Sequence, residues 1–135
     1  EVASQILGAM AEMHKHKLVH RDIKPQNILR CDDKWKLADF GISKFLDTPV
    51  TGYTFQGAHT VPWAPPEQIE GAPAHPSADV YAWGRVITCL LTGSTRREAV
   101  QMVPPKWAQL LNDCVNLVAD ARPSADQLIV RLKEV

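Results

Sequence analysis

The chain has 135 residues, of which 45% are hydrophobic and 22% are charged, as is usual for one globular domain or a part of one. Its 15 basic and 15 acidic residues cancel, which argues against nucleic acid or an anionic membrane as a main partner, because both select a basic face. No apolar run approaches the length of a membrane span. The sequence opens on Glu1 without a signal-peptide pattern, so we expect a cytoplasmic protein whose natural start lies upstream.

Residues 1 to about 16 are predicted to form an amphipathic helix, because Ile6 and Met10 belong to an apolar series with steps of three and four residues. His14 and His16 lie at its basic end. We interpret both as solvated side chains rather than metal ligands, since no Cys or carboxylate completes a site at a recognisable spacing. The three cysteines are too widely spaced to form a cluster and are expected to be reduced thiols.

A short β-hairpin is predicted next. Residues 28–30 and 35–38 are strand candidates, and the polar segment 31–34 joins them as a turn. Such a hairpin places Asn27, at its entry, close to Asp39, at its exit. Two oxygen-bearing side chains that are separated in the sequence therefore meet at one end of one hairpin.

The middle of the chain is predicted to be a long loop followed by a buried helix. Segment 42–64 shows no periodic pattern, and a loop of this length is usually functional or disordered. Residues 67–69 are expected to form a helical turn. Ser77 is a suitable N-cap for a helix over about 78–92, which Gly93 ends. This helix is apolar nearly all round, which indicates a central position; its apolar residues are Val80, Trp83, Val86, Ile87, Leu90 and Leu91.

Two more helices complete the predicted fold. The first opens at Pro104 and Pro105, and its apolar face is formed by Trp107, Leu110, Leu111, Cys114 and Val118. In the second, Ser124 and Gln127 have the spacing of a capping box, and the helix runs to about residue 133. The order of elements predicts a mainly α module with one small β element.

The hairpin and the loop before it carry residues suited to phosphoryl transfer. Segment 20–27 reads His-Arg-Asp-Ile-Lys-Pro-Gln-Asn. Asp22 can accept the proton of a substrate hydroxyl, and Lys24, two residues on in an extended loop, can neutralise charge on the transferred group. Asn27 and Asp39 offer the oxygen ligands that Mg²⁺ prefers. Each residue alone is ordinary in a loop, so the evidence lies in the combination.

This combination resembles the catalytic loop and the metal-binding Asp-Phe-Gly motif of protein kinases. Residues 59–67 resemble the end of a kinase activation segment, and residues 79–84 resemble the start of the central buried helix. The resemblance implies a C-terminal lobe that is mainly α within an α+β family fold. It divides the chain into a catalytic loop (20–27), a metal-binding motif (39–41), an activation segment (39–67) and a helical subdomain (77–135).

The resemblance also implies roles for individual residues. Asp22, Lys24 and Thr60 would be catalytic; Lys24, Asn27 and Asp39 would bind ATP, the last two through Mg²⁺; His20, Phe40 and Gly41 would be structural. Asp79 is expected to accept backbone N–H groups of the catalytic loop. Glu67 and Arg122 are expected to form a partly buried ion pair, and Arg21 to bind a phosphate on the activation segment. Candidate phosphorylation sites are Thr51 and Thr54, beside Thr48 and Tyr53.

Lys24 and Thr60 favour the serine/threonine branch of the family, with a protein Ser or Thr as substrate. The sequence departs from the family around the substrate-binding end of the activation segment, where His59, Val61, Trp63 and Pro65 replace the usual Gly, Pro, Tyr and Ala. These departures concern peptide selectivity more than phosphoryl chemistry. The region between Gly93 and Pro104 is short, so a partner-facing helix there is expected to be reduced.

No glycine-rich nucleotide loop or partner lysine precedes the motif in this chain. The family grips ATP with these groups from an N-terminal lobe, so we expect residues 1–135 alone to be inactive or very weak and to expose apolar surface. Two alternatives stay open. The chain is a non-catalytic interaction module derived from a kinase lobe, or a separate polypeptide supplies the first lobe.

Overall fold

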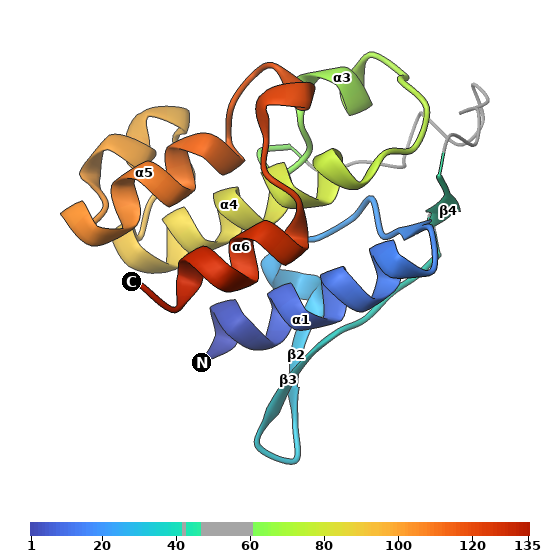
Figure 1. Cartoon of the computed structure of the whole chain (residues 1–135), viewed down its shortest axis with the longest axis horizontal. Helices are drawn as coiled ribbons and strands as arrows, with labels where there is room; N and C mark the ends of the chain where they lie inside the picture. Colours follow the sequence, from blue (N-terminus) through green and yellow to red (C-terminus); the bar gives the residue numbers. More distant parts are fainter. Residues whose placement is uncertain (42, 47–60) are drawn as a thin grey trace.

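The structure is a computed structural model that describes residues 1–41, 43–46 and 61–135. Its α-helices are α1 (Val2–Lys15), α3 (Pro66–Ile69), α4 (Pro76–Thr92), α5 (Pro105–Cys114) and α6 (Ala125–Leu132), with 3-10 turns η1 (Pro25–Asn27), η2 (Arg97–Met102) and η3 (Ala119–Ala121). The strands are β1 (Leu18–Val19), β2 (Ile28–Cys31), β3 (Lys34–Leu37) and β4 (Lys44–Phe45). The predicted class, a helical lobe with a small β-hairpin, is confirmed (Figure 1).

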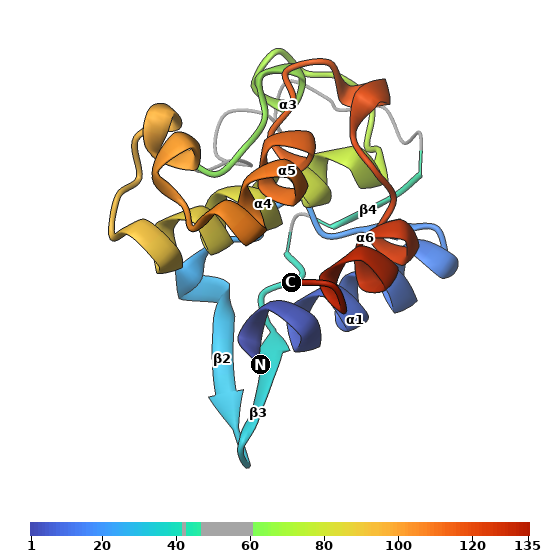
Figure 2. The same ribbon diagram turned by 60° about the vertical axis from the view of Figure 1, so that its left-hand side comes forward.

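The β2–β3 hairpin extends away from the helical body (Figure 2). Its strands are antiparallel, with Ile28 opposite Leu37 and Cys31 opposite Lys34, so the turn is shorter than predicted. Only Asp32 and Asp33 form it, with φ angles of 49° and 61°. Two successive left-handed residues match the twist of a tight hairpin, and Asp tolerates this region better than most residues.

A second strand pair was missed. β1 pairs with β4, with Leu18 opposite Phe45 and Val19 opposite Lys44. β4 lies in the segment predicted to be a long loop, and no strand was predicted at β1. Strands of two residues are too short to show an alternating pattern, so periodicity could not reveal them. The pair ties the chain just after the metal-binding motif to the chain just before the catalytic loop.

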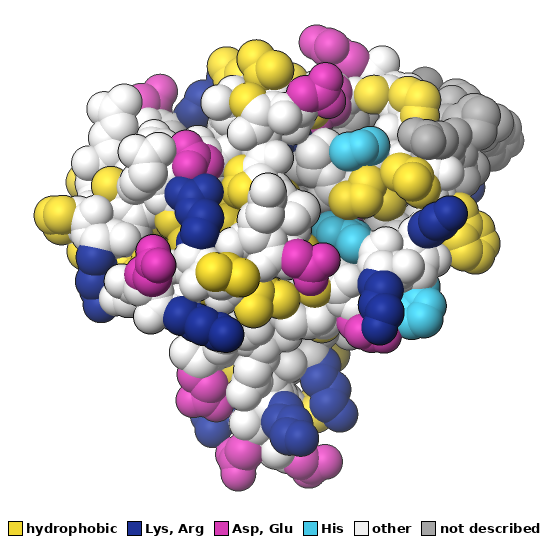
Figure 3. Space-filling model, in the orientation of Figure 1, with side chains coloured by type: hydrophobic (Ala, Val, Ile, Leu, Met, Phe, Trp, Pro, Cys, Tyr) yellow, Lys and Arg dark blue, Asp and Glu magenta, His cyan; other side chains and the backbone are white. Residues whose placement is uncertain are grey.

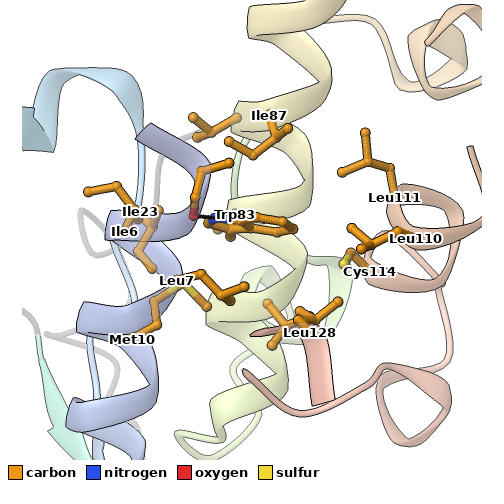
Figure 4. Close-up of a cluster of buried hydrophobic side chains, with 14 of the residues drawn as sticks. Ile6, Leu7, Met10, Ile23, Trp83, Ile87, Leu110, Leu111, Cys114 and Leu128 are labelled. Atoms are coloured by element: carbon orange, nitrogen blue, oxygen red, sulfur yellow. Dashed lines mark hydrogen bonds between the residues drawn. The ribbon is translucent and has the colours of Figure 1, made fainter. Parts of the chain in front are cut away.

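Helix α4 forms the centre of the core. Trp83 is fully buried, with side chains of α1 on one side and of α5 on the other, and its indole N–H donates to the carbonyl of Ala3 at 3.2 Å (Figure 4). The helix is buried from Ser77 to Thr88. The prediction fails at its last turn, where Leu90 and Leu91 are 57% and 37% exposed.

The helix ends follow the predicted signals with one shift. α4 begins at Pro76, and its N-cap is His75 rather than Ser77; the His75 Nδ1 accepts from the Ser77 N–H at 3.2 Å. A proline at the first position explains the shift, since its missing N–H costs nothing there. Gly93 ends the helix with a φ of 71°, as predicted. The capping box of α6 is also present, with Ser124 as its N-cap.

Helix α5 buries Leu110, Leu111 and Cys114, as predicted. Val118 does not belong to its face: it follows the helix and is 63% exposed. The cysteines are free thiols, and burial raises the pKa of the Cys114 thiol, which keeps it protonated. The expected reduction between Gly93 and Pro104 is also seen, because this region holds the 3-10 turn η2.

The surface carries charges of both signs side by side over the face seen in Figure 3, in keeping with the zero net charge. Across the described ranges, no helix has the length and apolar character needed to cross a membrane.

Gly84 lies close to the C-terminal end of α5, and its substitution is a test of this packing. A Cβ at Gly84 would lie 2.7 Å from the Cys114 Cβ and 3.1 Å from the Val115 Cγ1. We expect Gly84→Ala to destabilise the protein by about 1–3 kcal/mol through overpacking. Gly8→Ala is the matched control, because nothing lies within 4 Å of a Cβ there. It should stabilise α1 by about 0.5–1 kcal/mol. Chemical denaturation of both variants checks the opposite signs; a Gly84→Ala variant as stable as the unmodified protein would contradict the α4–α5 contact.

Candidate active site

The Asp79 carboxylate, at the start of α4, holds the backbone of the catalytic loop. Its Oδ2 accepts from the His20 N–H and its Oδ1 accepts from the Arg21 N–H, both at 2.8 Å. Asp79 is 1% exposed. Arg21 has a φ of 72°, in the left-handed region that costs a non-glycine residue roughly 1–2 kcal/mol. The expected contact is therefore present, and it keeps an unfavourable backbone conformation in place.

The His20 ring links this loop to the end of β3. Its Nδ1 accepts from the Asp22 N–H at 3.1 Å, so its Nε2 is the protonated nitrogen and donates to the Ala38 carbonyl at 2.9 Å. The ring also packs against Phe40, with centroids 5.0 Å apart. His20 is fully buried. It thus positions the backbone of Asp22 relative to the Asp39 motif.

Three of the predicted site residues meet around the Asp22 carboxylate. The Asn27 amide nitrogen donates to the Asp22 carbonyl at 2.8 Å and to the Asp22 Oδ2 at 3.1 Å. The Lys24 Nζ lies 3.3 Å from the same Oδ2. The side chains of Asp22 and Lys24 are 16% and 20% exposed, so a substrate can reach them while most of their surroundings are protein. Charges in such a partly dry site interact more strongly than in water.

Asn27 and Asp39 lie at the same end of the hairpin, as predicted. The Ala38 N–H donates to the Asn27 carbonyl at 2.8 Å, which extends the β2–β3 ladder by one pair and brings Asp39 next to Asn27. Both side-chain bonds of Asn27 use its nitrogen, which leaves its Oδ1 for another partner. Asp39 is exposed. One carboxylate and one amide oxygen fit Mg²⁺, which keeps few protein ligands and shares the rest with water and phosphate.

Gly41, expected to be structural, is constrained by a neighbouring side chain and not by a left-handed backbone. Gly71 and Gly93 are the described glycines with positive φ. A Cβ at Gly41 would lie 3.1 Å from the Asp39 Oδ1, and the Gly41 N–H donates to that oxygen at 3.2 Å. The position favours a small residue because the Asp39 carboxylate lies in contact with it.

Arg21 is also fixed from the other side. Its carbonyl accepts from the Gln68 Nε2 at 2.7 Å, and Gln68 in α3 is 5% exposed. Burial lowers the pKa of the Arg21 guanidinium, while the Asp79 carboxylate opposes this shift. Sequence reasoning missed Gln68, because a polar residue in a four-residue helix carries no signal of burial.

Arg122, just after η3, joins α3 to α4. Its Nη1 and Nη2 form a two-pronged ion pair with the Glu67 carboxylate, and the Nη2–Oε2 distance is 3.1 Å. The guanidinium also donates to the carbonyls of Ser77 at 3.1 Å and Asn116 at 2.7 Å, and it stacks over Tyr81 at 4.9 Å. The Arg122 side chain is fully buried. The expected ion pair is present, with more partners than the resemblance implied.

The prediction of two solvated histidines is wrong for His14. Its Nε2 lies 2.8 Å from the Asp79 Oδ2, and its side chain is 11% exposed. His16 is solvated as predicted, with a 69% exposed side chain 3.0 Å from Glu12. Nothing in the local sequence separates the two, since the difference depends on where α4 packs.

Several predicted residues have no structural outcome. Thr60 and the candidate phosphorylation sites Thr48, Thr51, Tyr53 and Thr54 lie outside the described residues, as does His59. Of the other departures from the family pattern, Trp63 is 7% exposed and belongs to the core, whereas Val61 is 68% exposed. The segment that ends at Glu67 is thus anchored in the core at its C-terminal end.

Comparisons with known proteins agree with this geometry. The family model described as "Protein kinase domain" matches residues 1–131. The chain is 33% identical over 147 residues to mitogen-activated protein kinase kinase kinase 12 of Rattus norvegicus, covering 94% of this chain and 16% of that protein. It is 42% identical over 96 residues to serine/threonine-protein kinase SBK2 of Mus musculus, covering 67% of this chain and 26% of that protein. It is 30% identical over 135 residues to probable serine/threonine-protein kinase PknB of Lactococcus lactis, covering 97% of this chain and 22% of that protein. The chain thus spans 16% to 26% of the length of these relatives, and it belongs to the protein kinase family.

Proposed function

We propose that this chain supplies the catalytic loop and the metal-binding motif of a serine/threonine protein kinase, which transfers the γ-phosphoryl group of ATP to a Ser or Thr hydroxyl of a protein. The observation that carries the proposal is the cluster around Asp22, where the Lys24 Nζ and the Asn27 Nδ2 lie 3.3 and 3.1 Å from one carboxylate oxygen. The names of the relatives support the choice of Ser and Thr over Tyr.

In this proposal the chain acts by orienting groups and by balancing charge. Asp22 accepts the proton of the substrate hydroxyl and aligns its oxygen for attack on phosphorus. Lys24, held beside it, neutralises negative charge on the phosphoryl group in transfer. Bound between Asn27 and Asp39, Mg²⁺ would add positive charge at the phosphates. Thr60, which lies outside the described residues, is proposed to bond Asp22 and Lys24.

ATP also has to be gripped through its adenine and its α- and β-phosphates. We propose that a second lobe, outside residues 1–135, does this and covers apolar side chains of this chain. Leu29, Phe40 and Phe45 are 46%, 49% and 69% exposed around the site-bearing hairpin and β4, which supports such a cover. The lobe belongs to the same polypeptide or to a separate one, and the location proposed for the assembly is cytoplasmic.

A non-catalytic interaction module is the alternative function. The Asp22–Lys24–Asn27 geometry counts against it, because a protein that only binds has no need to bring a base, a cation and a metal ligand within hydrogen-bonding distance. A measurement of phosphoryl transfer distinguishes the kinase from the interaction module.

The test compares residues 1–135 with the natural polypeptide that contains them, using radiolabelled γ-phosphate ATP and a mixed protein substrate. We expect Ser and Thr phosphorylation by the natural polypeptide, lost on chelation of Mg²⁺, and none by residues 1–135 alone. Transfer by residues 1–135 alone would disprove the need for a second lobe. Absence of transfer by a natural polypeptide that contains both lobes, in protein that is folded by circular dichroism, would favour the interaction module.

Gly41→Ala tests the metal-binding role of Asp39 within this proposal. The added Cβ would press on the Asp39 Oδ1 from 3.1 Å, so the carboxylate has to move by a few tenths of an ångström. Small misplacements of this kind cost several-fold in a pre-organised site. We expect the Mg²⁺ concentration for half-maximal transfer to rise roughly five-fold. Gly8→Ala should leave this Mg²⁺ concentration unchanged, because nothing lies within 4 Å of a Cβ there. Equal half-maximal Mg²⁺ concentrations for the two variants would contradict the metal-binding role of Asp39.

A further inference from the structure

The peptide unit that joins Arg21 to Asp22 is bound by a side chain at each of its polar ends. The Arg21 carbonyl accepts from the Gln68 Nε2 at 2.7 Å, and the Asp22 N–H donates to the His20 Nδ1 at 3.1 Å. Because these two groups share one rigid plane, the two bonds together fix how that plane is turned. The plane ends at the Cα of Asp22, from which the Asp22 carboxylate extends.

We propose that Gln68 is a positioning residue for Asp22: by holding the Arg21 carbonyl, it sets the direction in which the Asp22 side chain leaves the backbone. The inference rests on the proposed function only in naming Asp22 as the base. Gln68 lies 47 residues after Arg21, in α3, and thus outside the catalytic loop, the metal-binding motif and the activation segment that the family resemblance delimited.

The first reason is the backbone conformation of Arg21, which needs a restraint on each side of its Cα. A φ of 72° is unfavourable for arginine, so the chain relaxes away from it where the neighbouring peptide planes are free to turn. The Asp79 carboxylate binds the Arg21 N–H and restrains the plane before the Cα. The Gln68 amide binds the Arg21 carbonyl and restrains the plane after it, which is the plane that leads to Asp22.

The second reason is burial, which makes the donor at position 68 matter. Gln68 and Arg21 are 5% and 4% exposed, so water has little access to the bond between them. Leaving a buried carbonyl without a donor costs more than the net contribution of the bond that is lost. Turning the peptide plane is the motion that can bring the carbonyl to another donor, and it also moves the Cα–Cβ bond of Asp22.

Gln68 is itself held in place, as a residue that positions another has to be. Its N–H donates to the Pro65 carbonyl and its carbonyl accepts from the Gly71 N–H, both at 3.1 Å. The preceding residue, Glu67, is ion-paired to the buried Arg122 side chain. Helix α3 is therefore fixed to the helical body, and the Gln68 amide reaches the catalytic loop from a rigid base.

The experiment uses the natural polypeptide that contains residues 1–135. Gln68→Met keeps an unbranched side chain of similar size without a donor, and Gln101→Met makes the same change at an exposed glutamine of η2 as the matched control. Labelling arginine with ¹³C at the carbonyl and aspartate with ¹⁵N selects the Arg21–Asp22 peptide unit by NMR, because no other arginine of residues 1–135 precedes an aspartate. Loss of the signal in Asp22→Asn assigns it.

In Gln68→Met we expect the Arg21 carbonyl signal to move upfield, as a carbonyl carbon does when it loses a donor. We expect kcat to fall about 10- to 100-fold, since a misplacement of about 1 Å can cost about 10²-fold. The KM for Mg²⁺-ATP and the KM for the protein substrate should stay within about two-fold, because Asp22 acts in the transfer step and not in binding. Gln101→Met should match the unmodified protein in the carbonyl signal, kcat and KM.

Three results in a folded Gln68→Met variant would each overturn the proposal: an unmoved carbonyl signal, an unchanged kcat, or a loss of activity that lies in KM alone. An equal fall of kcat in Gln101→Met would also overturn it.

Gln68→Asn takes the place of a Gln68→Met variant that does not fold. The asparagine amide is one methylene shorter and stops short of the Arg21 carbonyl, so the same signal shift and the same fall in kcat are expected; unmodified behaviour would overturn the proposal. The carbonyl signal requires no phosphoryl transfer. A protein that is not a kinase would fail the transfer assay even when unmodified, whereas a kinase in which Gln68 does not position Asp22 would transfer normally in each variant, so the two failures are distinguishable.

Discussion

Replacing Arg122 with alanine is expected to lower the free energy of unfolding by about 3 kcal/mol, near the lower end of the usual cost of breaking a buried ion pair. The variant leaves Glu67 without its partner at 27% exposure and removes the donor to the Ser77 and Asn116 carbonyls. For a chain of this size such a loss corresponds to a fall of roughly 10 °C in melting temperature. Thermal unfolding followed by circular dichroism gives the measurement.

Arg97→Ala is the matched control for this prediction. Arg97 begins η2, is exposed, and forms no ion pair with a described residue. Removing an exposed charge usually changes stability by no more than about 0.5 kcal/mol. A clearly larger fall in melting temperature for Arg122→Ala than for Arg97→Ala supports the contacts by which Arg122 connects α3 to α4. Equal and negligible falls would count against the assigned fold.

Asp22→Asn is expected to reduce phosphoryl transfer by the natural polypeptide by about 10²–10⁴-fold, the usual contribution of a positioned base. Asparagine has nearly the same shape as aspartate, and its carbonyl oxygen can still accept the Asn27 amide bond seen at 3.1 Å. The melting temperature should therefore change little while the rate at saturating Mg²⁺ and ATP falls. Initial rates and a thermal melt of the same sample separate the two effects.

Asp33→Asn provides the control for that measurement. It removes the same charge from an aspartate that is 93% exposed in the hairpin turn, and asparagine tolerates the left-handed backbone found there. Its transfer rate should match that of the unmodified protein. If Asp22→Asn kept transfer within tenfold of the unmodified rate, Asp22 would not be the base.

The parts of the fold that the sequence predicted correctly are those whose signals are local. The capping box at Ser124 and the glycine stop at Gly93 each follow from a few neighbouring residues, and both are present. The Glu67–Arg122 pair joins residues 55 apart and was predicted only because a family resemblance supplied it. Spacing alone would not have paired them.

The parts that failed depend on which surfaces meet after folding. His14 and His16 share a helix and a residue type, yet one lies against α4 and the other faces solvent. Leu90 and Leu91 continue an apolar pattern past Thr88, where the buried part of α4 ends. In each case the sequence records the side chain but not what packs against it.

The large sequence separation between Asp79 and the amides that it binds has a consequence for folding during protein synthesis. The amides it binds lie 58 and 59 residues earlier in the chain. At ribosomal rates of about 5–20 residues per second, His20 and Arg21 wait roughly three to twelve seconds for their acceptor. The left-handed turn at Arg21 therefore cannot be stabilised in this way in any nascent chain that stops before α4. Shortening the protein from its C-terminal end should abolish the shape of the catalytic loop before it removes any residue of that loop.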